Sequence, residues 1–302
     1  MKKSYIKLML LSILLPTSSF SAQTGDSSYN FLKIGVGARA ISMGEAWVSI
    51  AEGANGMYYN PAGLSDSFSK EITFMHNIYL MDTSQEYLAF SFPLFSGGIG
   101  ISLNYFGSGL LAGRDENNLV AEAFSFTNLA ASAGYGINLL KTYSGNISAG
   151  IAVKGVGEWI ADYSSSSVAL DLGLLARFNS FSIGAAALNL GNAALPRSIT
   201  AGLSIKLLDN KLLLASGIKI PHDNEMYINA GLEYMVSKLF CVRAGYKYGA
   251  ENSSMGSLSG ITAGCGISVS NTEDVFGIII DIAMSYFGNL GSTYRFSLST
   301  RF

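Results

Sequence analysis

Residues 239–248 read Leu-Phe-Cys-Val-Arg-Ala-Gly-Tyr-Lys-Tyr, and their alternation decides the fold. The side chains of one parity are apolar or aromatic: Phe240, Val242, Ala244, Tyr246 and Tyr248. Those of the other parity are charged or small: Cys241, Arg243, Gly245 and Lys247. Because successive side chains of a β-strand point to opposite faces, this stretch predicts a strand with one apolar face and one polar face.

The same alternation recurs from about residue 72 to the end of the chain, in blocks of about ten residues separated by turn residues. The blocks begin near residues 72, 86, 97, 127, 145, 167, 180, 197, 211, 226, 239, 258, 274 and 290. Ten residues is the length of a tilted strand that crosses a bilayer, and an even number of strands fits a closed bacterial barrel. We therefore predict an all-β fold, a closed antiparallel transmembrane β-barrel of about fourteen strands.

Composition agrees with a wall in contact with lipid. Only 13% of the residues are charged, against about 25% in a typical soluble domain, and the net charge of -2 offers no basic field for nucleic acid. A soluble β-sandwich is the alternative, but it would need charges on its outward face. Here the charges share a parity with glycine and serine, opposite the leucines and isoleucines.

The connections between blocks also alternate. Short links lie around Asn179, Asp209 and Ser237, and longer ones near residues 107–121, 157–166 and 249–257 fall on the opposite parity. Short periplasmic turns and longer outer loops are typical of bacterial barrels. This pattern places both ends of the barrel in the periplasm.

Residues 1–21 are typical of a secretory signal peptide, with a positive start, an apolar stretch at 8–15 and small residues at Ser19 and Ser21. The alternative, a retained membrane helix, would need about 20 apolar residues. We expect the mature chain to begin near Ala22 and to reside in the bacterial outer membrane. Cys241 and Cys265 fall on opposite faces of their strands, so we expect two free thiols.

Residues 22–70 form a separate unit before the barrel of residues 71–302, because residues 29–65 break the alternation and are dense in small residues. A plug or hatch inside the barrel is the interpretation that would bury Trp47, Tyr58 and Tyr59. The alternative is a flexible periplasmic tail, which would leave these rings in water.

This segment carries a family resemblance. Its motif residues are Gly37, Arg39, Met43, Gly44, Asn60, Pro61 and Gly63, in the runs Gly-Ala-Arg-Ala, Met-Gly-x-Ala and Tyr-Asn-Pro-Ala-Gly-Leu. They resemble the opening block of the PorV/PorQ family, within the FadL-type outer-membrane barrels. The resemblance covers about 30 residues and implies a fourteen-stranded barrel with an N-terminal hatch. The carboxyl-terminal Phe302 resembles the signal that the barrel-assembly machinery recognises.

We find no catalytic or metal-binding pattern and expect no cofactor. His76 shares the apolar parity of its block and is interpreted as a packed residue; His222 is interpreted as a solvated loop residue. The charged residues on the polar face of the strands are predicted to face the lumen and to pair with one another and with the plug. These are Lys154, Asp171, Arg177, Lys206, Lys219, Glu233, Arg243, Lys247, Asp281, Arg295 and Arg301.

Three functions remain open. The PorV/PorQ resemblance implies a non-enzymatic barrel that handles secreted cargo proteins during type IX secretion. The FadL-type architecture implies, as an alternative, a passive channel for hydrophobic small molecules or fatty acids, whose hatch moves. A structural or adhesion barrel is the third hypothesis. The expected partners are outer-membrane lipid, the barrel-assembly machinery, and either cargo proteins or hydrophobic small molecules.

Overall fold

A computed structural model describes residue 25 and residues 27–114, 117, 119–249, 256, 258–270 and 276–302. The predicted signal peptide and cleavage site lie outside these residues, as does most of the connection at 249–257. Fourteen of the described strands form one closed antiparallel barrel, in which β1 pairs with both β2 and β16. Closure leaves no unpaired strand edge facing hydrocarbon.

The barrel strands begin close to the residues at which the sequence blocks begin, so the predicted fold class is confirmed. They are β1 (Glu71–Ile78), β2 (Thr83–Leu94), β3 (Gly97–Ser108), β6 (Phe126–Thr142), β7 (Gly145–Ile160), β8 (Tyr163–Phe178), β9 (Phe181–Leu190), β10 (Ser198–Leu207), β11 (Leu212–Pro221), β12 (Tyr227–Met235), β13 (Phe240–Tyr248), β14 (Ile261–Ser270), β15 (Gly277–Tyr286) and β16 (Ser292–Arg301).

The wall has the parity that the sequence predicts. In β10, Ile199 and Leu203 point outward and are 58% and 56% exposed, while Ser198 and Ser204 face the lumen and are buried. The same alternation of exposed apolar and buried polar residues recurs in β15 and β16. Because a water-soluble surface does not expose aliphatic side chains in rows, the outer wall is a lipid-facing surface.

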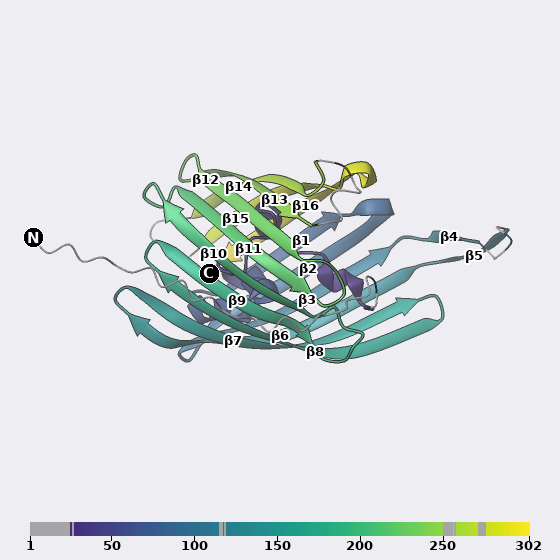
Figure 1. The fold of residues 1–302 in the computed structure, drawn as a ribbon, viewed down its shortest axis with the longest axis horizontal. Coiled ribbons are helices and arrows are strands. Elements are labelled where there is room, and N and C mark those ends of the chain that lie inside the picture. Colours follow the sequence, from purple (N-terminus) through teal and green to yellow (C-terminus); the bar gives the residue numbers. More distant parts are fainter. Residues whose placement is uncertain are drawn as a thin grey trace, which may run out of the picture.

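Two outer connections differ from the prediction. Residues 157–166 were expected to be a loop, but β7 and β8 continue through them and pair as far as Ile160 and Tyr163. Within the predicted loop at 107–121, a second hairpin begins, formed by β4 (Leu111–Arg114) and β5 (Val120–Phe124). Figure 1 shows that this hairpin projects from the barrel at the end opposite the C-terminus.

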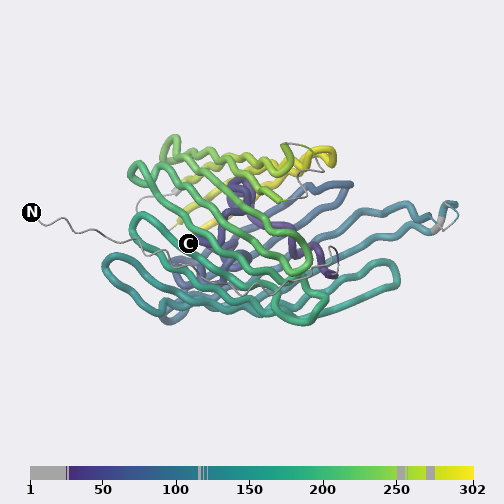
Figure 2. The backbone as a smooth tube through the Cα atoms, viewed as in Figure 1, coloured from purple at the N-terminus to yellow at the C-terminus, as the bar shows by residue number. Residues whose placement is uncertain are grey.

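The segment before the barrel lies in its interior (Figure 2). It contains four short helices: η1 (Asn30–Lys33), α1 (Ala38–Ser42), α2 (Gly53–Tyr59) and η2 (Pro61–Asp66). Two more one-turn helices, η3 (Leu80–Asp82) and η4 (Gly288–Leu290), belong to barrel connections. Trp47 is 2% exposed and Tyr59 is 7% exposed, so the rings that a periplasmic tail would leave in water are buried.

Glycines make the close fit between this segment and the wall. Gly44 has a left-handed backbone (φ +63°), and a Cβ there would lie 2.7 Å from the backbone nitrogen of Tyr246 on β13. On β8, a Cβ at Gly173 would lie 2.0 Å from Oδ1 of Asn60. These distances are shorter than any van der Waals contact, so the segment lies against wall backbone where larger residues would hold it away.

Among the described residues, the helices are all too short or too polar to cross a bilayer.

Candidate functional site

An ion network joins the interior segment to the wall in the half of the lumen nearer the C-terminus. Arg39 in α1 donates from Nε and Nη2 to the two carboxylate oxygens of Glu233, at 2.7 Å each, and from Nη1 to Glu52 at 3.0 Å. Glu233 also accepts from Nε of Arg243 at 2.5 Å, and Arg243 donates to Asp281 at 2.7 Å. Buried charges need such partners. Here Arg39 and Glu52 belong to the interior segment, and the other members of the network belong to the wall.

Three further ion pairs tie the segment to the wall at different heights. Asp66 in η2 accepts from Arg177 on β8 at 2.5 Å. Glu45 accepts from Lys247 on β13 at 2.9 Å. Near the outer end, Lys33 donates to Asp223 at 2.5 Å. The interior segment is therefore fastened to the wall by charge-assisted contacts along its length.

The Asp223 contact lies outside the spanning strands, in the connection between β11 and β12. Its carboxyl group also accepts a hydrogen bond from Ser27 and is 1% exposed. Burial acts to raise the pKa of Asp223, but the hydrogen bonds from Lys33 and Ser27 outweigh it and hold that pKa below its usual value. The ionised form is thus the one that anchors the start of the described chain.

The turn at Asn60 and Pro61 is fixed to the wall through backbone groups. The side-chain nitrogen of Asn60 donates to the carbonyl groups of Val48 and Leu174, at 3.0 Å each, and its oxygen accepts from the amide of Ala62 at 3.1 Å. Leu174 belongs to β8 and Val48 to the interior segment. One fully buried amide therefore links the two units and closes the first turn of η2.

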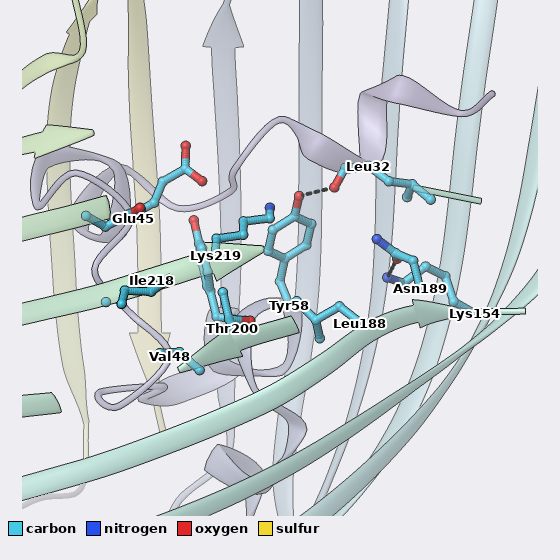
Figure 3. A pocket seen from close by; sticks show the side chains of 13 residues that line it. Leu32, Glu45, Val48, Tyr58, Lys154, Leu188, Asn189, Thr200, Ile218 and Lys219 are labelled. Atoms are coloured by element: carbon cyan, nitrogen blue, oxygen red, sulfur yellow. Dashed lines mark hydrogen bonds between the residues drawn. The ribbon is translucent and has the colours of Figure 1, made fainter. Parts of the chain in front are cut away.

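Part of the outer lumen holds an apolar cluster, beside buried polar wall residues such as Asn104, Asn128 and Asn189. Tyr29, Phe31 and Leu32 pack against wall and loop residues whose side chains point inward: Ala130, Val156, Ala169 and Leu195. Below them lies a cavity of about 30 Å³. Figure 3 shows the ring of Tyr58 beside Lys219 in this cavity, with the Tyr58 hydroxyl donating to the carbonyl of Leu32 at 2.7 Å. That volume holds about one or two water molecules.

Two larger hollows lie toward the C-terminal end of the barrel. One, of about 220 Å³, is lined by Arg39, Trp47 and Asp281 among others, and one of about 400 Å³ by Phe68 and Arg301 among others. Residues of the same interior segment line the small outer cavity and both hollows. In this arrangement the segment separates the outer cavity from the periplasmic end.

The structure places the predicted lumen charges on the inward parity of their strands. Lys154, Asp171, Glu233, Arg243, Asp281 and Arg295 are buried; Arg177, Lys219, Lys247 and Arg301 are half-buried; Lys206 is exposed near the end of β10. Lys154 pairs with Asp171 at 3.0 Å, and Arg301 with Glu71 at 2.7 Å. Arg295 donates instead to the hydroxyls of Ser285 and Thr293.

Only some of the motif residues of the opening block contact the barrel wall. Arg39 and Asn60 make the contacts to the wall, and Gly44 and Met43 lie against wall glycines, with Met43 0% exposed. Gly37 is the N-cap of α1, and Pro61 and Gly63 belong to η2. Phe302 lies at the periplasmic end, where it exchanges two backbone hydrogen bonds of 3.0 Å with Lys70.

Sequence reasoning missed Lys33, Glu45, Tyr58 and Asp223 as contact residues. The first three lie in the segment without alternation, where no pattern marks which side chains face the wall. Asp223 is 190 positions from Lys33, so their contact depends on the tertiary fold. For Asp223, the available sequence signal was its position two residues after Pro221 in a predicted outer loop.

The histidines and cysteines form no reaction centre in the described chain. His76 faces outward as its parity predicts, beside Phe296 on β16, and it also pairs with Glu86 across the β1–β2 ladder. His222 is half-buried, which corrects its interpretation as a solvated residue. Cys241 and Cys265 are free thiols. No group of three His, Cys, Asp or Glu residues within the described ranges has metal-binding geometry.

A closed antiparallel barrel with an apolar outer wall and a charged, filled interior defines a transmembrane β-barrel of the bacterial outer membrane. Known structures of that class resemble it over 88% of the chain. They include the toluene transporter TbuX of Ralstonia pickettii (TM-score 0.61, 12% identity, 97% of that chain). The toluene transporter TodX of Pseudomonas putida (0.58, 13%, 96%) and a FadL homologue of Pseudomonas aeruginosa (0.55, 9%, 96%) also resemble it.

At these identities the likeness shows the fold alone, which is the fold of the FadL-type barrels. No protein-family profile and no curated protein sequence matches the chain.

Proposed function

We propose that the chain is a passive, non-enzymatic channel that carries hydrophobic small molecules across the outer membrane. The observation that carries this proposal is the apolar cluster in the outer part of the lumen. In a water-filled porin the lumen side of the wall is polar. Here Val156 and Ala169 point inward at that level and pack on Tyr29, Phe31 and Leu32. An apolar contact surface of this kind favours the binding of apolar molecules over sugars and ions.

The resemblance to barrels that carry toluene and other monoaromatic hydrocarbons supports the same class of cargo. The cavity beside Tyr58 is smaller than a benzene ring needs, so passage requires the interior segment to move. The ion pairs of Arg39, Asp66 and Glu45 are the contacts that must part or exchange partners during this movement. Because each pair is polar and local, it can reform when the molecule has passed.

A gene deletion tests this proposal. The deletion strain should take up labelled toluene and a labelled long-chain fatty acid more slowly than the parent, and the wild-type gene on a plasmid should restore the rate. Uptake of a small sugar, which enters through other porins, serves as the control and should not change. Equal uptake of both hydrophobic molecules in parent and deletion strains would overturn the proposal.

Protein export of the PorV/PorQ type is the second candidate. The motif around Gly37 to Gly44 and Asn60 to Gly63 favours it, as does the projecting β4–β5 hairpin, whose ends carry the exposed apolar residues Leu110, Leu119 and Val120. The same deletion strain distinguishes the two candidates. Loss of secreted proteins from the cell surface, with normal uptake of hydrophobic molecules, would favour export.

A further inference from the structure

His76 and Glu86 form a side-chain contact on the outer face of the barrel wall, away from the lumen, and this contact is an ion pair when the imidazole is protonated. Nδ1 of His76 lies 2.8 and 3.0 Å from the two carboxylate oxygens of Glu86. The two residues are direct cross-strand partners on β1 and β2, and their side chains are 42% and 33% exposed. The pair therefore lies on the surface that faces lipid.

This pair differs from the other ionisable residues of the barrel strands. Within the described strands, every other Asp, Glu, Lys, Arg and His in the barrel lies on the inward parity. Lys141 follows the bulge in β6 and keeps that parity because it pairs with Asn146, whose side chain reaches Asp66 in the interior segment. A single charged pair on an otherwise apolar wall thus requires its own explanation.

The surroundings of the pair are apolar and aromatic. His76 is flanked across the ladder by Phe296 on β16, and Glu86 by Tyr105 on β3. Both rings are exposed on the same face. Ionisable groups that face acyl chains are costly, by an amount that falls toward the membrane interfaces, and in a membrane-spanning segment such groups are by default a functional-site hypothesis.

The chemistry of the pair indicates which partner. With Nδ1 bonded to Glu86, His76 presents Nε2 outward, and Nε2 has no partner among the described residues. Each Glu86 oxygen can accept a second hydrogen bond. In the protonated imidazole both ring nitrogens donate. Nε2 is then a donor beside these acceptors, and this arrangement is complementary to itself about a two-fold axis. A lipid phosphate fits less well, because Glu86 would face it with like charge.

We propose that the wall around His76 and Glu86 is the contact surface for a second copy of this chain. In the homodimer, Nε2 of each His76 donates to Glu86 of the other copy, and the apolar neighbours Phe74, Leu88 and Phe296 surround the four polar groups. Such an interface is isologous, because the same surface patch of both copies forms it, and its two-fold symmetry limits the assembly to a dimer.

The test measures dimerisation in lipid. Full-length protein, labelled at Asp209→Cys after replacement of both native cysteines by serine, is placed in liposomes at a series of protein-to-lipid ratios. Single-molecule photobleaching then counts the copies in each complex. We expect dimers that dissociate on dilution in lipid, and we expect the single variant His76→Glu, which sets two carboxylates side by side, to weaken the dimer at least about tenfold.

Two variants make the result specific. The swapped variant His76→Glu/Glu86→His restores a donor beside an acceptor and should dimerise like the wild type. Ser216→Leu, on the outward parity of β11, is the matched wall control and should change nothing. Should His76→Glu fail to fold, His76→Leu/Glu86→Leu suits a lipid-facing wall and should likewise weaken the dimer.

Wild-type protein that stays monomeric at every ratio would overturn the proposal, and so would undiminished dimerisation of His76→Glu or of the double leucine variant. Monomeric wild type that binds lipopolysaccharide vesicles more tightly than the double leucine variant would assign the pair to a lipid headgroup instead.

Discussion

Arg39 in α1 and Glu233 on β12 are joined by two hydrogen bonds of 2.7 Å, which link the interior segment to the barrel wall. Glu233 is 6% exposed and also accepts from Arg243, so a single carboxylate bridges two guanidinium groups. A guanidinium group that donates to both oxygens of one carboxylate fixes the relative orientation of the two side chains as well as their distance. This contact is therefore the principal polar connection between the segment and the C-terminal part of the wall.

We expect Glu233→Gln to loosen the interior segment. The change removes the carboxylate that Arg39 and Arg243 share. Because Arg39 keeps Glu52 and Arg243 keeps Asp281, we expect the loss to fall below the about 3–5 kcal/mol of a buried charge left without any partner. Limited proteolysis in detergent should then cut the segment between η1 and η2 faster than in wild type. Glu225→Gln, in an exposed outer loop, is the control. Equal cleavage rates in both variants would contradict the assigned role of Glu233.

The fit between wall and turn predicts a steric effect at Gly173. Valine there would place its Cβ against Oδ1 of Asn60 and force the Asn60–Pro61 turn away from β8. We expect a loss of stability of a few kcal/mol, since the buried Asn60 amide would also lose its bond to Leu174. Gly155→Val makes the same change where a Cβ would meet nothing within 4 Å, and its thermal unfolding midpoint should stay that of wild type. A Gly173→Val barrel as stable as Gly155→Val would show that the turn does not rest on β8.

The anchor at Asp223 should depend on pH. Because the folded pKa of Asp223 lies below its usual value, the ionised carboxylate stabilises the folded contact above about pH 4. That contribution falls as the pH drops through the usual aspartate range and then through the lowered folded value. A fluorescent label near Tyr29 should therefore gain mobility in acid. Asp223→Asn should be mobile already at neutral pH and show no such step; an unchanged acid transition in this variant would assign it to another group.

Phe302 is expected to serve assembly more than stability. Its two backbone bonds to Lys70 help to close the periplasmic end, and the exposed ring resembles the signal read by the barrel-assembly machinery. Deleting Phe302 should lower the amount of folded protein in the outer membrane several-fold, while refolding of the purified chain into detergent changes little. If both fall together, the ring has a structural role instead.

The wall could be predicted from sequence because its two-residue period is local and long. The strand starts, to within about four residues, and the inward parity of residues such as Arg243 and Asp281 followed from it. The extension of β7 and β8 could not be predicted in this way. Ser164 to Ser167 resemble a polar loop, yet they pair in register with Val156 to Trp159 in the part of the hairpin nearest its outer turn, where no lipid imposes apolar residues.

The interior contacts are less predictable for a different reason. Arg39, Glu45 and Lys33 lie in a segment with no period, so their neighbours are set by how the chain folds into the lumen. Their partners lie 194, 202 and 190 positions away. Sequence reasoning gave the inward parity of Glu233 and Lys247 but not the residues that they contact. Likewise, parity put His76 on the outer face without revealing its bond to Glu86.

A reversible tether tests most directly whether hydrophobic molecules pass by movement of the interior segment. In a chain without native cysteines, Arg39→Cys and Glu233→Cys are linked by a short bifunctional thiol reagent, and the protein is placed in liposomes. The flux of labelled toluene should be high before linkage, fall to the level of empty liposomes after it, and return on reduction. Flux that is the same with the tether intact and with the tether cleaved would contradict passage through a lumen that this segment closes.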